Sequence, residues 1–325
     1  MSLPPLLAGL RLPVVGAPMF LVSGPELVIA QCTAGIVGAF PALNARPQAA
    51  LAEWLERITA ALAAWDSAHP QRPAAPFAVN LIVHATNPRL DEDLETCLAW
   101  RVPILVTSLG ARPALNDRAR AAGALVLHDV IDDGFARKAI DKGAHGLIAV
   151  ATGAGGHAGT LSPFALLQDV RRWFDGPLLL AGAIASGDAV LAAEAAGADL
   201  AYVGSAFIAT EEARAAPAYR QMIVDGAAAD VVYTAAFSGV AANYLRASVR
   251  AHGLDPDTRP TRSMDFGAGL TEGDGAKPWR DVWSAGQGIG VVDRVVTTAT
   301  LVDRLRREYV AARRRLALSG EGGHG

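Results

Sequence analysis

Short apolar runs alternate with alanine-rich segments of helical periodicity through the first two thirds of this chain. Each run is almost free of polar residues, which is typical of a parallel strand buried on both faces. Every connection has the form strand, then helix, so right-handed crossovers predict an open doubly wound sheet or a closed barrel. A count of eight favours the α/β fold of a (β/α)8 TIM barrel. The eight expected strands span residues 13–17, 36–40, 77–81, 104–108, 124–129, 146–150, 177–181 and 200–204.

About 120 residues follow the last expected strand, more than one further helix requires. We expect helices over 211–225 and through 227–249, a polar loop over 252–277, and a closing amphipathic helix over 291–316. The order predicts a smaller helical second domain, residues 211–285, inserted after strand eight. The barrel domain would then comprise residues 1–210 and 286–325. We interpret the basic run RLRREYVAARRR in the last helix as a solvated face rather than an anion site.

Composition excludes several classes of function. Lysine and arginine number 29 against 32 acidic residues, a net charge of -3, so nucleic acid and anionic membranes are not expected partners. Cys32 and Cys97 lie far apart without metal-ligand spacing, which favours a reducing compartment and no metal site. The apolar start of the chain is broken by prolines and lacks a basic region, so we expect a cytoplasmic protein. The sequence leaves the oligomeric state open, with a homodimer among the alternatives.

Small residues follow the seventh and eighth expected strands. Gly182 and Ala183 come after one, and Gly204 and Ser205 come after the other, each pair just before a helix. In a parallel barrel these two turns are neighbours at the carboxyl face, where backbone N–H groups can bind a phosphate. The alternative is that the glycines only permit tight turns.

A glycine-rich loop, ATGAGGHAGT, follows the sixth expected strand. Its glycines, Gly155 among them, let the backbone approach a flat ligand closely, and His157 brings one titratable imidazole to that ligand. A surface histidine without a role is the alternative. His128, at the end of strand five, lines the same mouth or is a satisfied core histidine.

Three further positions belong to the expected barrel mouth. Asn80 interrupts the apolar third strand, and a ring with donors and acceptors, or a neighbouring loop, would satisfy its amide. Ala17 and Met19 follow the first strand. The late segment WSAGQGIG, with Gln287, is a weaker signal for a loop that closes over the mouth.

Together these motifs resemble the nitronate monooxygenases, once called 2-nitropropane dioxygenases. The resemblance rests on APM after the first strand, PFAVNL, AGGHxG, the two small-residue turns and the late SAGQG, in matching order from about residue 12 to 310. It implies a (β/α)8 barrel with a helical second domain and FMN held non-covalently between them. Its implied cofactor contacts are Ala17, Met19, Asn80, His128, Gly155, Gly182, Ala183, Tyr202, Val203, Gly204 and Ser205.

The resemblance also implies a reaction. His157 matches the catalytic histidine, which would abstract the proton α to a nitro group or hold charge beside a bound nitronate. The flavin would oxidise the nitronate, and O2 would complete its conversion to a carbonyl compound and nitrite. The expected substrate pocket, for which plain packing is the alternative, consists of Phe20, Tyr233, Phe237 and Tyr244.

Departures from the family pattern leave the substrate open. Many relatives carry a glutamate and a glutamine where this chain has Gly153 and Val150, and some carry a lysine where it has His128 and Asp129. NAD(P)H-dependent quinone reductases and flavin-dependent enoyl-acyl-carrier-protein reductases share a similar Gly-Gly-His loop and are the alternative function. A flavin-binding protein without catalysis is a third alternative.

Overall fold

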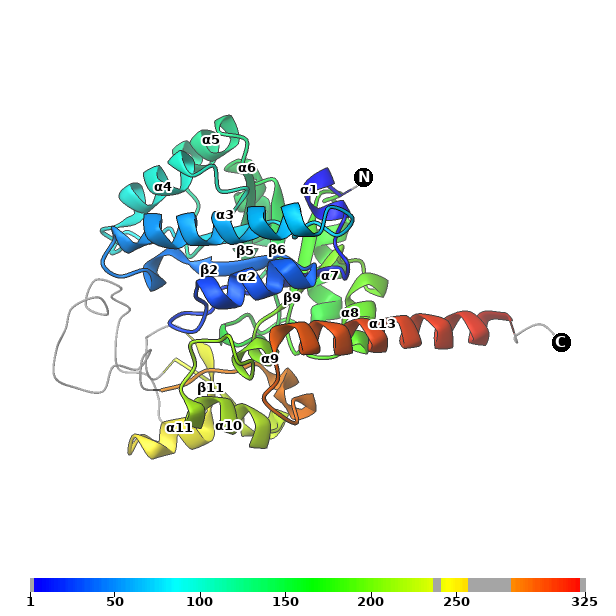
Figure 1. Ribbon diagram of the computed structural model, residues 1–325. Helices are drawn as coiled ribbons and strands as arrows, with labels where there is room; N and C mark the ends of the chain where they lie inside the picture. Colours follow the sequence, from blue (N-terminus) through cyan, green and yellow to red (C-terminus); the bar gives the residue numbers. More distant parts are fainter. Residues whose placement is uncertain (1–2, 236–240, 257–281, 322–325) are drawn as a thin grey trace.

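The computed structural model describes residues 3–235, 241–256 and 282–321. Its centre is a parallel sheet of eight strands, and helices surround this sheet (Figure 1). The strand order is β1-β9-β8-β6-β5-β4-β3-β2. A parallel bridge between Val15 and Val37 joins the first and last strands, so the sheet closes into the predicted TIM barrel. The barrel strands are β1 (Val14–Gly16), β2 (Gly38–Pro41), β3 (Phe77–Ile82), β4 (Ile104–Ser108), β5 (Leu125–Val130), β6 (Gly146–Val150), β8 (Leu178–Ala181) and β9 (Leu200–Val203).

Helices follow the strands as the alternating pattern predicted. Serine, aspartate or proline marks several helix starts: the Asp132 carboxylate accepts from the backbone N–H of Phe135, and Ser186 Oγ accepts from that of Ala189. The helices of the barrel are α1 (Pro5–Ala8), α2 (Pro25–Ala34), η1 (Ala42–Asn44), α3 (Ala50–Ala68), α4 (Leu90–Ala99), α5 (Pro113–Ala121), α6 (Asp133–Asp141), α7 (Pro163–Arg171), α8 (Gly187–Ala195) and α9 (Ser205–Ile208).

The barrel interior is filled by alternate residues of its strands. Val15, Ala39, Val106, Ile148 and Leu179 form one buried inner cluster. Their neighbours along the strands face the surrounding helices and form two outer clusters. This alternation decides which side chains at the strand ends can reach the mouth, because only inward-facing positions do so.

The segment after β9 differs from the expected helical domain. The prediction of helix through 227–249 was wrong, because VVYT and ANYL form strands β10 (Val231–Thr234) and β11 (Ala242–Leu245). These β-branched and aromatic residues pair antiparallel with each other, and β11 also pairs with β7 (Gly156–His157) from the glycine-rich loop. The remaining elements are α10 (Pro217–Asp225), η2 (Ala228–Asp230), α11 (Arg246–Ala251), η3 (Gln287–Val291) and α13 (Thr298–Glu321). Most of the expected loop over 252–277 lies outside the described residues.

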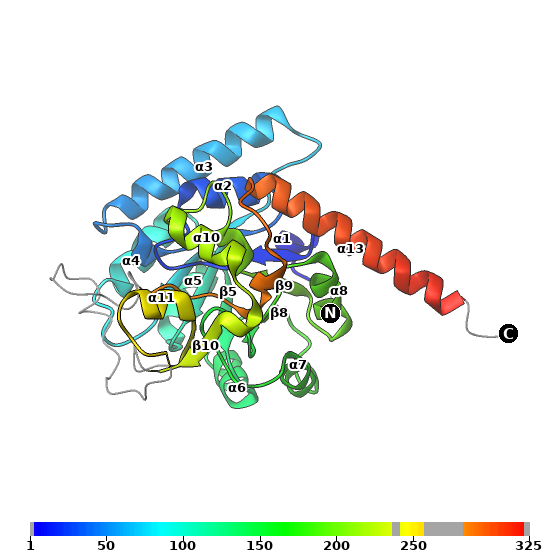
Figure 2. The ribbon, with the colours of Figure 1, turned by 90° about the horizontal axis from the view of Figure 1, so that it is seen from below.

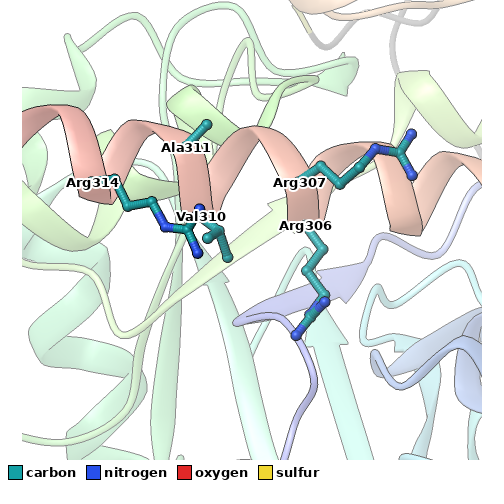
Figure 3. Close-up of a pocket in the computed structure, with 5 residues that line it drawn as sticks. All are labelled: Arg306, Arg307, Val310, Ala311 and Arg314. Carbon is teal, nitrogen blue, oxygen red and sulfur yellow. The ribbon is translucent and has the colours of Figure 1, made fainter.

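The closing helix α13 lies against α8 and extends beyond it, as two views at right angles show (Figures 1 and 2). Leu301, Val302 and Leu305 bury its inner face. The outer face carries a hollow of about 300 Å³ (Figure 3) lined by Arg306, Arg307, Val310, Ala311 and Arg314. The three arginines are exposed, which agrees with a solvated basic face.

No helix in the described ranges combines the length and the apolar character that crossing a membrane requires.

Candidate functional site

Loops from distant parts of the chain meet in a glycine-lined cradle at the carboxyl face of the barrel. The backbone N–H groups of Ala183 and Gln287 both donate to the carbonyl of Gly153, at 3.2 and 2.9 Å. A Cβ atom added at Gly155 would lie 2.9 Å from the backbone nitrogen of Gly286 and 3.2 Å from Ser205 Oγ. The structure therefore brings together the two small-residue turns, the glycine-rich loop and the late SAGQG segment.

Ser205 connects two walls of this cradle. Its Oγ accepts a 2.7 Å hydrogen bond from the backbone N–H of Gly286. A serine hydroxyl can also donate one hydrogen bond, so its proton remains available for an acceptor in the cradle. Gly204 and Ser205 are partly exposed and can be reached by a ligand.

The end of β1 forms the adjoining wall. A Cβ atom at Gly204 would lie 3.4 Å from Ala17 Cβ and 3.8 Å from Met19 Sδ. Asn44, which the sequence did not single out, fixes this loop: its Nδ2 donates to the carbonyls of Met19 and Ser23, and its Oδ1 accepts from Leu21. An asparagine in a short 3-10 helix gives no local signal of such a role.

A chain of hydrogen bonds crosses the inner wall of the mouth. Asn80 Nδ2 donates to the Val106 carbonyl at 3.2 Å and to Ser108 Oγ at 2.7 Å. Ser108 in turn donates a 2.5 Å hydrogen bond to Asp129 Oδ2. Both N–H groups of Asn80 are thus used within the protein, so its amide can offer a ligand only its carbonyl oxygen.

Asp129 and Tyr202 each hold a buried polar atom on this inner side. Asp129 Oδ1 and Tyr202 Oη have no hydrogen-bond partner within the described part of the chain. Burial raises the pKa of Asp129 to about 6, although the hydrogen bond from Ser108 favours the charged form and partly offsets this rise. Burial, and then the nearby Asp129 carboxylate, raises the pKa of Tyr202. Two uncompensated polar atoms in a barrel mouth are what a polar ligand would satisfy.

His157 lies on β7 at the edge of the cradle. His157 is the strand partner of Ala242 on β11, and the Nε2 atom of its imidazole is shielded from solvent. Burial lowers the pKa of the imidazole to about 4, so the ring is neutral near pH 7 and can accept a proton.

Residues of the second sheet hold the loop on either side of His157. Asn243 Nδ2, buried on β11, donates a 2.6 Å hydrogen bond to the Ala154 carbonyl. Tyr233 Oη on β10 donates to the Ala158 carbonyl at 2.9 Å. The sequence placed Tyr233 in a substrate pocket and missed Asn243, because it assigned this whole stretch to helix.

The structure corrects the placement of three expected site residues. His128 points outward from β5, where its Nδ1 lies 2.5 Å from Thr107 Oγ1, and burial followed by the charge of Lys142 lowers its pKa to about 4. Strand alternation explains the error, since Asp129, the next residue, faces the mouth instead. The Val203 side chain likewise belongs to an outer cluster. Tyr244 is fully buried in the core of the second sheet, so it does not line an open pocket.

The last two pocket candidates lie in different regions. Phe20 follows Met19 in the loop after β1, and the guanidinium carbon of Arg46 lies 5.2 Å from the centre of its ring. Phe237 lies outside the described residues.

Comparisons with known proteins identify a family and a shared fold. A family model described as nitronate monooxygenase matches residues 6–308. A nitronate monooxygenase of Paraburkholderia phytofirmans is 29% identical over an alignment that covers 93% of each chain. The solved structure of a nitroalkane oxidase from Streptomyces ansochromogenes has a TM-score of 0.78 and 26% identity, covering 94% of this chain and 98% of that one. FabK from Thermotoga maritima has a TM-score of 0.76 at 24% identity over 96% of both chains, which shows a shared fold.

Proposed function

Because the chain belongs to the nitronate monooxygenase family, whose flavoenzyme neighbours imply a flavin cofactor and an oxidoreductase activity, we propose that it is an FMN-dependent nitronate monooxygenase. It would oxidise alkyl nitronates with O2 to carbonyl compounds and nitrite. The observation that carries this proposal is the glycine-lined cradle, together with Asp129 Oδ1 and Tyr202 Oη, two buried polar atoms that have no hydrogen-bond partner among the described residues. The outward His128 and the buried Tyr244 take no part in it.

The residues present fit FMN. The loops of the cradle approach one another so closely that a Cβ at Gly155 or Gly182 would come within 3.0 Å of backbone atoms, so glycine at these positions lets backbone groups rather than side chains line the cradle. The unpartnered Asp129 Oδ1 and Tyr202 Oη provide polar contacts farther inside. A ligand with a phosphate at one end and a polar ring at the other satisfies both features.

Each part of FMN would then have its own set of residues. Gly182, Gly204 and Ser205 would hold the phosphate through backbone N–H groups and the Ser205 hydroxyl, and Ala183, whose N–H already donates to the Gly153 carbonyl, would line the same turn. Ala17, Met19 and the Asn80 carbonyl would contact the ring, with Gly155 and Tyr202 nearby. Bound FMN supplies the oxidation–reduction chemistry, and the protein supplies binding, orientation and proton transfer.

His157 would act on the substrate as a general base. With its pKa near 4, the ring carries no charge at neutral pH, which is the form that accepts a proton from the carbon next to a nitro group. Burial counts against the alternative role of holding a positive charge beside a nitronate. A nitronate is already deprotonated and makes the base unnecessary.

The region 211–285 would cover the substrate side of the mouth. Tyr233 and Asn243 attach its sheet to the glycine-rich loop. Phe20, from the loop after β1, and Phe237 remain proposed pocket residues that would give the small substrate an apolar surface.

Absorption spectra of the purified protein test this function. The protein should carry an FMN spectrum, and anaerobic addition of propyl-2-nitronate should bleach it without any nicotinamide. Readmission of air should restore the spectrum and release nitrite. No spectral change with the nitronate, combined with rapid bleaching by NADH or NADPH, would replace this proposal with a nicotinamide-dependent reductase. A protein that binds FMN but responds to none of these compounds would be a binding protein only.

A further inference from the structure

Asp129 is an acid on the inner wall of the mouth that the proposed reaction does not use. It lies near the end of β5 and faces inward, whereas His128 faces out. The residue as a whole is partly exposed, but its Oδ1 atom is shielded from solvent. In a barrel with a packed interior, the remaining exposure of an inward-facing residue at this end is toward the mouth.

The groups that face Asp129 provide little compensation for a negative charge. Ser108 on β4 donates the only hydrogen bond recorded for this carboxylate in the described chain. Tyr202 on β9 is close enough for its pKa to be raised by the Asp129 charge, but it does not donate to Oδ1. Ile148 and Val150 on the neighbouring strand β6 are apolar.

Among the residues that the structure describes, the other titratable groups of this region do not supply the missing cation. His157 is kept neutral by burial. The positive charge of Lys142 acts on His128, on the outer side of β5. A ligand that covers the mouth would remove water from a carboxylate with one neutral donor, and burying such a charge is costly.

We propose, on the basis of the proposed FMN site, that Asp129 takes up a proton from solvent when FMN fills the mouth. The carboxylate and one solvent proton become a neutral carboxyl group, and no other bond forms or breaks. In that state the carboxyl can donate a hydrogen bond to an acceptor on the ring, whereas the carboxylate can only accept. Asp129 is therefore a positioning residue that makes cofactor binding depend on pH.

The surroundings of Asp129 indicate that its pKa rises further when a ligand binds. The loss of the remaining water around Asp129 when a ligand covers the mouth disfavours the charged form of this acid. The pKa of this acid is already raised to about 6 in the protein without ligand, so a modest further rise crosses neutral pH. By linkage, FMN then binds more weakly as pH increases through this range.

Isothermal titration of FMN into flavin-free protein, in buffers of different ionisation enthalpy between pH 6.5 and 8.5, measures this proton uptake. The phosphate of FMN also titrates near pH 6, so the informative quantity is the difference between the wild type and Asp129→Asn. We expect the wild type to take up as much as about one proton more per FMN bound than the variant. Asp133→Asn, an acid outside the barrel on α6, serves as the matched control and should behave as the wild type.

A second variant separates proton uptake from simple loss of structure. Ser108→Ala removes the hydrogen bond that favours the carboxylate, so the pH of greatest uptake should move upward. Equal uptake by the wild type and Asp129→Asn, with FMN bound by both, would overturn this inference and leave the proposed function intact. Failure of the wild type to bind FMN would overturn both.

Discussion

The side-chain amide of Asn243 donates a 2.6 Å hydrogen bond to the backbone carbonyl of Ala154, 89 positions earlier in the chain. This bond lies beside the pairing of Asn243 with Gly156, so it fixes the loop immediately before His157. The conformation of the proposed catalytic loop is therefore set by the second sheet as well as by the barrel.

Asn243→Ala should lower activity without unfolding the barrel. The substitution leaves the buried Ala154 carbonyl unsatisfied, a local cost of about 1–3 kcal/mol. We expect a reduced kcat with neutral nitroalkanes, which need the base at His157, and a small loss of stability in urea. Asn116→Ala is the matched control, because Asn116 also bonds a single carbonyl, that of Lys142, but on the outer side of the barrel. Equal loss of activity in both variants would contradict a specific role for Asn243.

His157→Asn should retain FMN and separate the two classes of substrate. We expect turnover of neutral nitroalkanes to fall about 100-fold or more, the usual contribution of a general base, while nitronate oxidation is largely preserved. In the wild type, protonation of a base with a pKa near 4 should lower kcat/KM for nitroalkanes only on the acid side, near pH 4. An unchanged nitroalkane rate in the variant would exclude His157 as the base.

Gly155→Ala should weaken FMN binding. The new Cβ would lie 2.9 Å from the backbone nitrogen of Gly286, so one wall of the cradle must shift. An overpacked contact of this kind costs about 1–3 kcal/mol, equivalent to a roughly 5- to 150-fold increase in Kd if the cost falls on the bound state. Gly134→Ala on α6, where the Cβ meets only an ordinary contact at 3.4 Å, should bind FMN as the wild type does. Fluorescence titration with FMN compares the three proteins.

Gly187→Ala should destabilise the attachment of α13. A Cβ at Gly187 would overlap the backbone of Leu305 and Tyr309, and the Gly187 N–H also donates to Glu308 Oε2 at 2.8 Å. We expect a loss of about 1–3 kcal/mol in the free energy of unfolding, read from urea denaturation. A midpoint equal to that of the wild type would show that the two helices separate easily at this contact.

Asp129→Asn should alter the pH dependence of stability in the protein without FMN. The folded-state pKa, about 6, lies above the ordinary value of 3.8, so the stability contributed by this group is present below pH 3.8 and is lost as pH rises through 6. Between pH 4 and pH 8 the wild type should lose about 2–2.5 kcal/mol relative to the variant. Urea denaturation of both proteins at the two pH values measures the difference, and parallel pH profiles would contradict a raised pKa.

The barrel was predictable from sequence because its information is local. Most of the buried strands are largely apolar runs, and several helices carry their own start residue, as Ser186 and Asp132 do. The second sheet was not predictable in this way, because VVYT and ANYL become strands only by pairing with each other and with the loop at His157.

The parts of the candidate site that lie at strand ends were predictable from the sequence, whereas the parts that depend on distant contacts were not. The small-residue turns at Gly182 and Gly204 and the loop at Gly155 follow from strand ends, and the structure brings all three together. His128 was misplaced by a single residue, since a one-residue shift in a strand reverses the direction of the side chain. Asn44 and Asn243 act on carbonyls far away in sequence, and nothing near them in the chain indicates those partners.

The hydrogen bond from Gln287 to Gly153 sets a limit on the order of assembly. All eight barrel strands have been translated once residue 203 is added. The segment that forms one wall of the cradle, at Gly286 and Gln287, is translated more than 80 residues later. A nascent chain can therefore close its barrel while its glycine-lined cradle is still incomplete. Binding of the proposed cofactor would then have to await the segment that carries Gly286 and Gln287, and it would report that this segment had reached its place.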